Sequence, residues 1–284
     1  AMVTPFTDDG SLDLPGARAL ASHLVDHGSH GLVVAGTTGE SPTLEPDEVI
    51  RLLEAVLAEV GDRATVIAGT GSNSTRHASE LTRRAALAGA HGALVVAPYY
   101  NKPNPAGIRA HFAAVAEAAG HTPVIVYNIP SRCVINIPPD LLAELAAEHK
   151  PIVAVKQANN DDLGPIEGMD VLAGNDDVFA RCLALGGTGG ILVASHVVGD
   201  RMRAVYDAAT AGDHDRARRL DVELRPVYEA LTVTANPIPV KAALAMQGLI
   251  GETMRLPMVP ATEAERAVVR DALEAHGMKV GGAA

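Results

Sequence analysis

Lys156 has the clearest capacity for chemistry in this sequence. It ends the run Pro151-Ile-Val-Ala-Val-Lys156, in which apolar residues lead a cation to the end of a predicted buried strand. A lysine amine has an ordinary pKa of about 10.4, so at neutral pH only about one molecule in a few thousand carries the uncharged nucleophile. Burial at the mouth of an apolar strand lowers this pKa, which is how imine-forming lysines are activated. The alternative is a lysine that extends from the strand end into solvent.

Residues with hydroxyl groups follow two other predicted strands. One strand leads into Gly36-Thr-Thr-Gly-Glu40, where glycines permit a tight turn and the amides and hydroxyls of Thr37 and Thr38 suit a small anion. Another leads into Pro98-Tyr-Tyr-Asn101, so two phenols lie in one loop. The alternative interpretations are a purely structural turn and tyrosine rings that are packed with satisfied hydroxyls.

The next predicted strand, the fifth, adds a further phenol and a cation. Tyr127 ends that strand, and Arg132 in the following loop could hold a carboxylate with two parallel hydrogen bonds. A lysine, proton-passing hydroxyls, an anion-binding turn and an arginine together suit reactions between an amine and a carbonyl group. Such a site can form an imine with a 2-oxo acid, use the iminium as an electron sink and join the enamine to an aldehyde.

The elements that must position these residues form a regular series. Short apolar runs rich in β-branched residues alternate with helical patterns, and they begin near residues 2, 31, 65, 93, 123, 152, 171 and 190. Eight such units predict an α/β fold, a (β/α)8 TIM barrel whose reactive groups lie on the loops after the strands. An open doubly wound sheet is the alternative, but no G-x-G-x-x-G follows the first strand.

Strand patterns stop after Gly212, and helical patterns continue to about His276. We therefore expect a catalytic barrel over residues 1–212 and a C-terminal helical region over residues 213–284. The first strand is short because Pro5 ends it, which indicates that its beginning is missing.

Composition excludes several classes of function. The 284 residues carry a formal net charge of −11, which disfavours binding to nucleic acid or to an anionic membrane. Two cysteines, Cys133 and Cys182, fit packing roles in a reducing compartment, so we expect a cytoplasmic protein. No apolar run reaches the ~20 residues of a membrane span.

One helix carries residues spaced like metal ligands: His23, Asp26, His27 and His30. Its end points to the face of the barrel away from the reactive loops, so we expect no metal site there.

Three motifs resemble one known family. Gly31-Leu-Val-Val-Ala-Gly-Thr-Thr-Gly-Glu40, Tyr127-Asn-Ile-Pro-Ser-Arg132 and Val155-Lys156 are similar, in order and spacing, to the pyruvate-dependent class I aldolases typified by dihydrodipicolinate synthase and N-acetylneuraminate lyase. Two further segments, Asn236-Pro-Ile-Pro-Val-Lys241 and Leu256-Pro-Met258, resemble the dihydrodipicolinate synthase branch. The resemblance covers essentially the whole chain.

The resemblance implies a covalent imine between Lys156 and pyruvate, with no other cofactor and no metal. Thr37 and Thr38 would hold the pyruvate carboxylate. Tyr127, Thr37 and Tyr100 would form the proton relay, with Tyr100 reaching in from a neighbouring subunit of a homotetramer built as a dimer of dimers.

The remaining implied roles concern the second substrate and the main chain. Arg132 would bind the carboxylate of aspartate semialdehyde, and Gly174 and Ile191 would make backbone contacts near the pyruvate. The sequence departs from the family at two positions, since Gln157 replaces a common acidic residue and Cys133 replaces a common threonine.

The implied reaction is the condensation of pyruvate with aspartate semialdehyde in diaminopimelate and lysine biosynthesis. One alternative is another pyruvate aldolase, acting on 2-keto-3-deoxy sugar acids or N-acetylneuraminate. A second alternative is a non-catalytic barrel that senses a metabolite, although a sensor needs no proton relay.

The resemblance also implies a regulatory lysine pocket, which this chain changes. His77 replaces the acid that would pair with the lysine ammonium, so we expect lysine to inhibit weakly or not at all. The other positions of the pocket are Ser41, Pro42, Pro46, Val49, Asn73 and Tyr99.

Overall fold

The structure is a computed structural model, and it describes residues 1–281. Contacts within the chain divide it into two compact units. We call Ala1–Ala64 together with Val193–Ala284 the terminal unit, and Thr65–Leu192 the central unit. The division into residues 1–212 and 213–284 stays a prediction.

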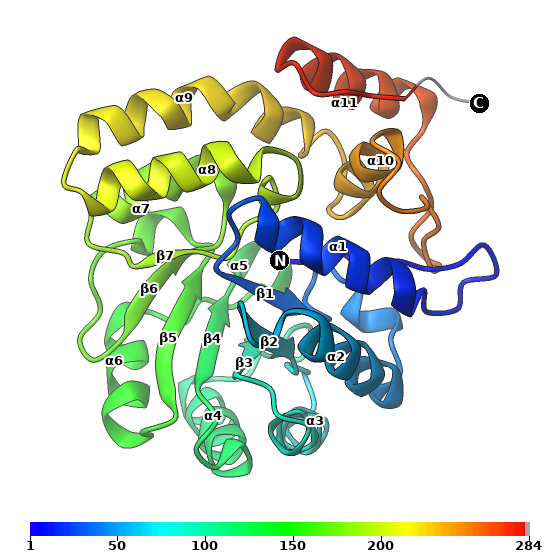
Figure 1. Cartoon of the computed structure of the whole chain (residues 1–284). Helices are drawn as coiled ribbons and strands as arrows, with labels where there is room; N and C mark the ends of the chain where they lie inside the picture. The colour runs from blue at the N-terminus through cyan, green and yellow to red at the C-terminus, as the bar shows by residue number, and fades with distance from the viewer. Residues whose placement is uncertain (282–284) are drawn as a thin grey trace. The chain divides into compact units, whose positions relative to one another are not determined.

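The central unit is built on parallel strands that pair in chain order. Figure 1 shows them side by side, from cyan to yellow-green. Residues on both faces of the strands are buried, as in β4, and this explains the near-continuous apolar runs in the sequence. The strands are β2 (Thr65–Gly69), β3 (Gly92–Val96), β4 (Val124–Asn128), β5 (Ile152–Gln157), β6 (Asp170–Ala173) and β7 (Gly189–Gly190).

Helices of the central unit lie outside these strands (Figure 1). The α3 helix packs against α4, and α4 packs against α6. Side chains cap the first turns of two of these helices. The Ser74 hydroxyl accepts from the His77 amide at α3, and the Asn104 side chain accepts from the Gly107 amide at α4. The helices are α3 (Thr75–Leu87), α4 (Pro105–Ala119), α5 (Pro130–Cys133), α6 (Pro139–Glu148) and α7 (Phe179–Ala184), with 3₁₀ turns η2 (Asn160–Asp162) and η3 (Asp176–Val178).

The strand register sets which residues become neighbours. Tyr127 lies opposite Lys156 across the β4 and β5 pair, and Lys156 lies opposite Leu172 of β6. Because parallel strands end at one edge of the sheet, the segments that follow β3, β4, β5 and β6 start from the same edge. Tyr127 and Lys156 lie at the ends of β4 and β5, and Tyr100, Arg132 and Gly174 lie on the segments that follow β3, β4 and β6.

The terminal unit contains one strand and the remaining helices. α1 packs against α2, α8 against α9, and α10 against α11, as Figure 1 also shows. Its elements are α1 (Leu14–Asp26), β1 (Gly31–Val34), the 3₁₀ turn η1 (Ser41–Thr43), α2 (Pro46–Val60), α8 (Ser195–Thr210), α9 (His214–Ala230), α10 (Ile238–Met246) and α11 (Glu263–Ala275). Helices therefore occupy the C-terminal part of the chain, as predicted.

One predicted strand is absent from the described residues. Seven of the eight predicted positions carry strands, but the stretch that begins at Met2 does not. The Met2 amide donates to the Val33 carbonyl at 3.0 Å, and the Val3 amide donates to the His196 ring at 3.2 Å. The Val3 amide is therefore bound to a side chain and cannot pair with a neighbouring strand. Pro5 has no amide hydrogen with which to continue such pairing.

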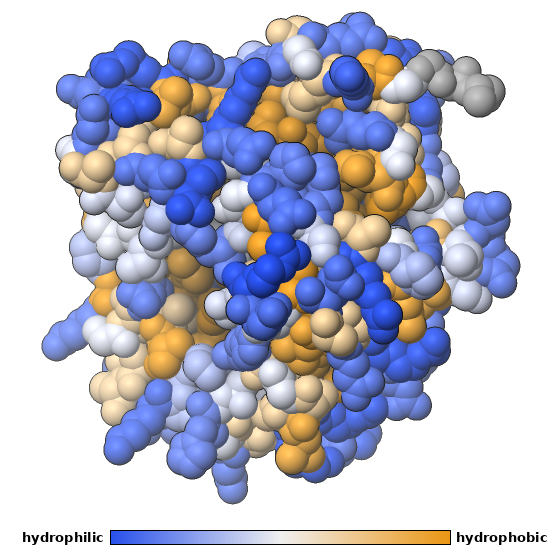
Figure 2. Space-filling view, in the orientation of Figure 1, coloured by the Kyte–Doolittle hydropathy of each residue, from blue (hydrophilic) through white to orange (hydrophobic). Residues whose placement is uncertain are grey.

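Hydrophilic residues cover most of the face that Figure 2 shows, in keeping with the charged composition. Within residues 1–281, no helix has both the length and the apolar character needed to cross a membrane.

Candidate functional site

Lys156 lies at the end of β5 and is only 5% exposed. Its Nζ atom lies 4.3 Å from the centre of the Tyr127 ring on the neighbouring strand. Burial lowers the pKa of Lys156 to about 8, while the charge of Asp176 acts in the opposite direction and that of Arg132 lowers the pKa further. An amine with this pKa is roughly one-tenth uncharged at pH 7, about two hundred times more than an ordinary lysine. The structure therefore confirms a buried rather than an extended Lys156.

Tyr127 forms one wall beside the lysine. The side chain is buried at the end of β4, and the register fixes it next to Lys156. Both strand ends are tied together one residue further on, because the Asn128 side-chain amide donates to Gln157 Oε1 at 2.9 Å. Gln157 Oε1 also accepts from the Asn159 amide at 3.1 Å. Gln157, which departs from the family pattern, thus helps to hold the two strand ends in register.

Gly174 and Ile191, which the resemblance implies make backbone contacts near the pyruvate, directly follow β6 and β7. The Gly174 amide donates to the Gln157 carbonyl at 2.8 Å, and the Ile191 amide donates to the Ala173 carbonyl at 2.9 Å. A Cβ atom at Gly174 would lie 2.8 Å from the Gln157 oxygen, so the chain can approach this closely only as glycine. Both residues continue the strand edge that carries Lys156.

Arg132 lies in α5, the single helical turn after β4. Its side chain is exposed, and among the described residues its guanidinium forms no hydrogen bond or ion pair. The turn ends at Val134, which adopts a left-handed conformation with φ of 65°. An exposed guanidinium without a protein partner is available to an anionic ligand.

Cys133, the neighbour of Arg132, faces the interior. Its thiol donates to the Ala97 carbonyl at 3.2 Å, and burial raises the pKa of Cys133 to about 11. Burial also raises the pKa of Cys182 to about 11. Both thiols are therefore protonated and unreactive at neutral pH.

Tyr100 differs from the residues above because its side chain is 87% exposed. It adopts a left-handed backbone with φ of 72° in the loop after β3. The neighbouring Asn101 anchors this loop by donating from its side chain to the Asn73 carbonyl at 2.8 Å. Tyr100 is thus held outward, away from the buried wall that Tyr127 and Lys156 form.

The Gly36–Glu40 turn follows β1 in the terminal unit. The Gly39 amide donates to the Gly36 carbonyl at 3.0 Å, which closes the turn. Thr38 is buried, and its hydroxyl oxygen accepts from the Asn236 side chain at 3.0 Å. The main-chain amides of Thr37 and Thr38 donate to no acceptor among the described residues. Two adjacent amides without protein acceptors suit a carboxylate.

A second lysine, Lys241, is fully buried at the start of α10. Its Nζ atom lies 2.5 Å from a Glu40 carboxylate oxygen and donates to the Thr253 carbonyl at 2.8 Å. Within residues 1–281, Lys156 is the buried lysine that has no carboxylate within ion-pair distance. The Lys241–Glu40 pair cannot be predicted from the sequence, because no local pattern shows that two residues so far apart in the chain are in contact.

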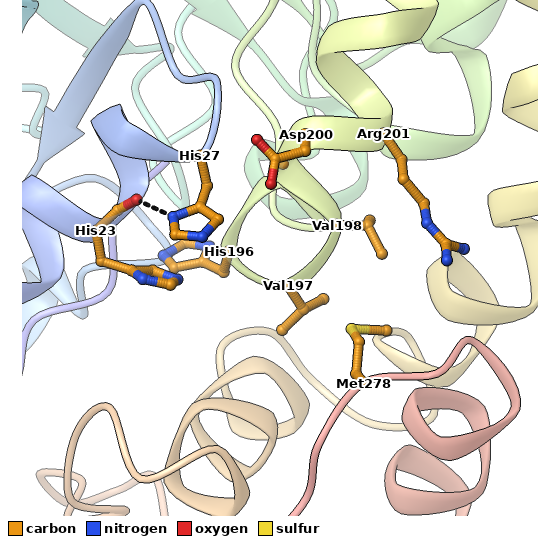
Figure 3. A pocket seen from close by; sticks show the side chains of 9 residues that line it. His23, His27, His196, Val197, Val198, Asp200, Arg201 and Met278 are labelled. Atoms are coloured by element: carbon orange, nitrogen blue, oxygen red, sulfur yellow. Dashed lines mark hydrogen bonds between the residues drawn. The ribbon is translucent and has the colours of Figure 1, made fainter.

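His23 of α1 and His27, the residue that caps the end of this helix, line a pocket of about 140 Å³ in the terminal unit (Figure 3). The His23 and His27 rings lie 4.1 Å apart between centroids, and the His27 ring nitrogen Nδ1 donates to the His23 carbonyl. Asp26 instead pairs with Arg63, and His30 contacts the Tyr206 ring. Among the described residues, no group of three or more potential ligands has an arrangement that could hold a metal ion.

Parallel strands that pair in chain order and alternate with helices, followed by further helices, agree with the class of (β/α)8-barrel proteins, of which the described residues contain seven strands. The sequence profile of the Dihydrodipicolinate synthetase family matches residues 1–276. The chain belongs to this family. The resemblance predicted from the motifs is therefore confirmed.

Individual relatives support the same assignment. A 4-hydroxy-tetrahydrodipicolinate synthase of Moorella thermoacetica is 49% identical, over 98% of this chain and 97% of the relative. The lysine-bound enzyme of Cyanidioschyzon merolae matches with a TM-score of 0.94 and 39% identity, over 98% and 97% of the two chains. The dihydrodipicolinate synthase of Acinetobacter baumannii complexed with pyruvate matches with a TM-score of 0.94 and 36% identity, again over 98% and 97%. The predicted fold class is thus confirmed.

The burial of Lys156 predicts a pH profile for its amine. Acylation should rise with pH to a plateau with a midpoint near pH 8, because below this pKa the amine is protonated and unreactive. Trace labelling with acetic anhydride, quantified for the Lys156 peptide by mass spectrometry, measures the profile. The same peptide from the urea-unfolded chain is the control, with a midpoint of about 10.4. Coincident folded and unfolded profiles would contradict a desolvated amine.

Proposed function

We propose that this chain catalyses the aldol condensation of pyruvate with L-aspartate 4-semialdehyde to 4-hydroxy-tetrahydrodipicolinate, a step of diaminopimelate and lysine biosynthesis. The observation that carries the proposal is the buried Lys156, with its lowered pKa and with Tyr127 beside it. The relatives named 4-hydroxy-tetrahydrodipicolinate synthase and the pyruvate complex of a structural neighbour support this assignment. The predicted lyase class agrees with those names.

The first half of the reaction activates pyruvate. The neutral amine of Lys156 attacks the C2 carbonyl of pyruvate, and loss of water leaves an iminium ion. The positive nitrogen acts as an electron sink, so a proton leaves C3 and an enamine forms. Each proton transfer needs a nearby hydroxyl, and Tyr127 is the phenol closest to Lys156 in the central unit.

The second half joins the substrates and releases the enzyme. C3 of the enamine attacks the aldehyde carbon of the semialdehyde, whose oxygen takes up a proton to become the ring hydroxyl. The amino group of the semialdehyde then attacks C2 and displaces Lys156, which closes the ring. One water molecule is released overall, and the chain needs neither an added cofactor nor a metal for these steps.

The carboxylates of the substrates require local positive groups in an acidic protein. We assign the pyruvate carboxylate to the amides and hydroxyls of Thr37 and Thr38, whose amides have no acceptor among the described residues. We assign the semialdehyde carboxylate to Arg132, whose exposed guanidinium forms no hydrogen bond or ion pair with the residues that the structure describes. Gly174 and Ile191 would supply main-chain contacts near the pyruvate.

The proton relay would be completed by Thr37 and by Tyr100 of a neighbouring subunit. The 87% exposure and left-handed backbone of Tyr100 support an intermolecular role, because a fixed, exposed phenol is available to another chain. We therefore propose a homotetramer arranged as a dimer of dimers. The protonated, buried thiols of Cys133 and Cys182 fit the proposed cytoplasmic location.

Covalent trapping tests the assignment of Lys156. Reduction with borohydride in the presence of pyruvate should add one pyruvate-derived group per chain at Lys156, and Lys156→Ala should remove both label and turnover. Lys150→Ala, which removes an exposed lysine six residues earlier, should leave both intact. Label that persists in Lys156→Ala or lies on Lys241 contradicts the assignment. Parallel assays of 2-keto-3-deoxygluconate and N-acetylneuraminate cleavage identify a different aldolase if either exceeds the condensation.

Replacement of Arg132 tests the second subsite. Arg132→Lys keeps the charge but loses the planar pair of donors, and a charged hydrogen bond contributes about 1.5–3 kcal/mol. The kcat/KM for aspartate semialdehyde should therefore fall about tenfold or more, with pyruvate trapping nearly unchanged. Arg181→Lys, an exposed change in α7, is the control and should alter neither. Lost trapping with unchanged semialdehyde kinetics would place Arg132 elsewhere.

Lysine should inhibit this chain weakly or not at all. His77 is exposed, and its ring nitrogen Nε2 accepts from the Arg76 guanidinium at 2.9 Å, so a cation already occupies the place where a lysine ammonium would need an acid. Initial rates titrated with L-lysine should give half-inhibition above about a millimolar, an affinity weaker than about 4 kcal/mol. His77→Glu should strengthen inhibition. Half-inhibition well below a millimolar in the unaltered chain would refute this interpretation.

A further inference from the structure

The Lys241 ammonium is enclosed by groups of the terminal unit. It pairs with Glu40 at 2.5 Å, donates to the Thr253 carbonyl at 2.8 Å and lies 4.4 Å from the centre of the Phe6 ring. Glu40 is itself buried. Removing one partner of such a pair leaves an uncompensated charge in the interior. Lys241 and Glu40 therefore hold each other in place.

Glu40 needs this restraint because its backbone is unusual. Its φ is 56°, a left-handed conformation that residues with a Cβ atom rarely adopt without support. The second carboxylate oxygen accepts from the Arg255 amide at 3.1 Å, and the Arg255 guanidinium binds Glu48 with two hydrogen bonds of 2.6 and 2.7 Å. Lys241 and Arg255 thus hold the two carboxylate oxygens of Glu40, one each, and Glu48 in turn balances the charge of Arg255.

The conformation of Glu40 is coupled to the two threonines before it. The Glu40 amide donates to the Thr37 carbonyl at 3.1 Å, and the Asn236 side chain donates to the Thr38 hydroxyl at 3.0 Å. Asn236 precedes α10, the helix that carries Lys241. The segment from Asn236 to Lys241 therefore holds the Gly36–Glu40 turn at two points, nearly 200 residues away in sequence.

We propose that Lys241 is a positioning residue for substrate binding, which acts through Glu40 to fix the directions of the Thr37 and Thr38 amides. The inference rests on the proposed function, in which these amides hold the pyruvate carboxylate. Lys241 does not touch the substrate in this role, because Glu40 and Thr253 occupy its ammonium. Donors that are fixed in advance bind an anion without reorganisation, so loosening the turn weakens carboxylate binding.

The double variant Lys241→Met/Glu40→Gln tests the proposal without leaving an unpaired charge. Methionine is uncharged and of similar length, and glutamine keeps an acceptor for the Arg255 amide. The pyruvate concentration that gives half-maximal borohydride trapping should rise about tenfold, the loss expected for one misplaced carboxylate contact. Full labelling of Lys156 should still be reached at saturating pyruvate, and the KM for aspartate semialdehyde should stay unchanged.

Arg266→Met is the matched control. It removes the ion pair with Glu252 in the same unit, and neither residue contacts the Gly36–Glu40 turn through a hydrogen bond or ion pair among the described residues. Thermal stability should fall, while half-saturation by pyruvate stays the same. If the double variant does not fold, Lys241→Gln/Glu40→Gln, which also leaves no unpaired charge and allows the two amides to hydrogen-bond each other, gives the same readout with a smaller rise.

Three outcomes overturn the inference. Unchanged half-saturation in a folded double variant, whether Lys241→Met/Glu40→Gln or Lys241→Gln/Glu40→Gln, assigns the pair to stability alone. An equal rise in Arg266→Met indicates general loosening of the unit. If unaltered protein is not labelled by pyruvate at all, the proposed function fails, and this inference fails with it.

Discussion

The cost of burying an ammonium group without a carboxylate is the constraint on which the candidate site depends. At Lys156 this cost appears as a pKa lowered to about 8, which makes the amine available near neutral pH. The lowering lasts only while water is excluded from the end of β5. Pairing of β5 with β4 and β6, and the hydrogen bond between Asn128 and Gln157, keep that strand end closed. The strand register is therefore part of the chemistry as well as of the fold.

The two buried lysines have different surroundings, and only Lys156 is proposed to react. Burial lowers the pKa of both amines, but at Lys241 the hydrogen bond and the charge of Glu40, at 2.5 Å, oppose the lowering, whereas Lys156 has the face of the Tyr127 ring. A carboxylate stabilises the charged amine, whereas a ring face does so only modestly. The same side chain thus serves as a fixed cation in one place and as a nucleophile in the other.

The sequence predicts well whatever depends on local pattern. Apolar runs locate seven strands, and the position of Lys156 at the end of one of them predicts its burial. Local patterns do not show which distant residues are in contact. Neither the Lys241–Glu40 pair nor the hydrogen bond between Gln157 and Asn128 could therefore be predicted. Helical spacing also suggests ligands that the fold uses otherwise, since His30 contacts Tyr206. The stretch at Met2 is predicted as a strand because its residues are apolar. They are apolar because they are buried, and they form no strand.

The division of the chain into two units has a consequence for biosynthesis on the ribosome. The central unit is one continuous segment, so it can complete its internal contacts as soon as Leu192 has emerged. Residues 1–64 find their partners within the terminal unit only once the segment from Val193 onward is made. At roughly 5–20 residues per second, the early helices wait on the order of ten seconds. During that interval the part of α1 that packs against α8 in the finished unit stays uncovered.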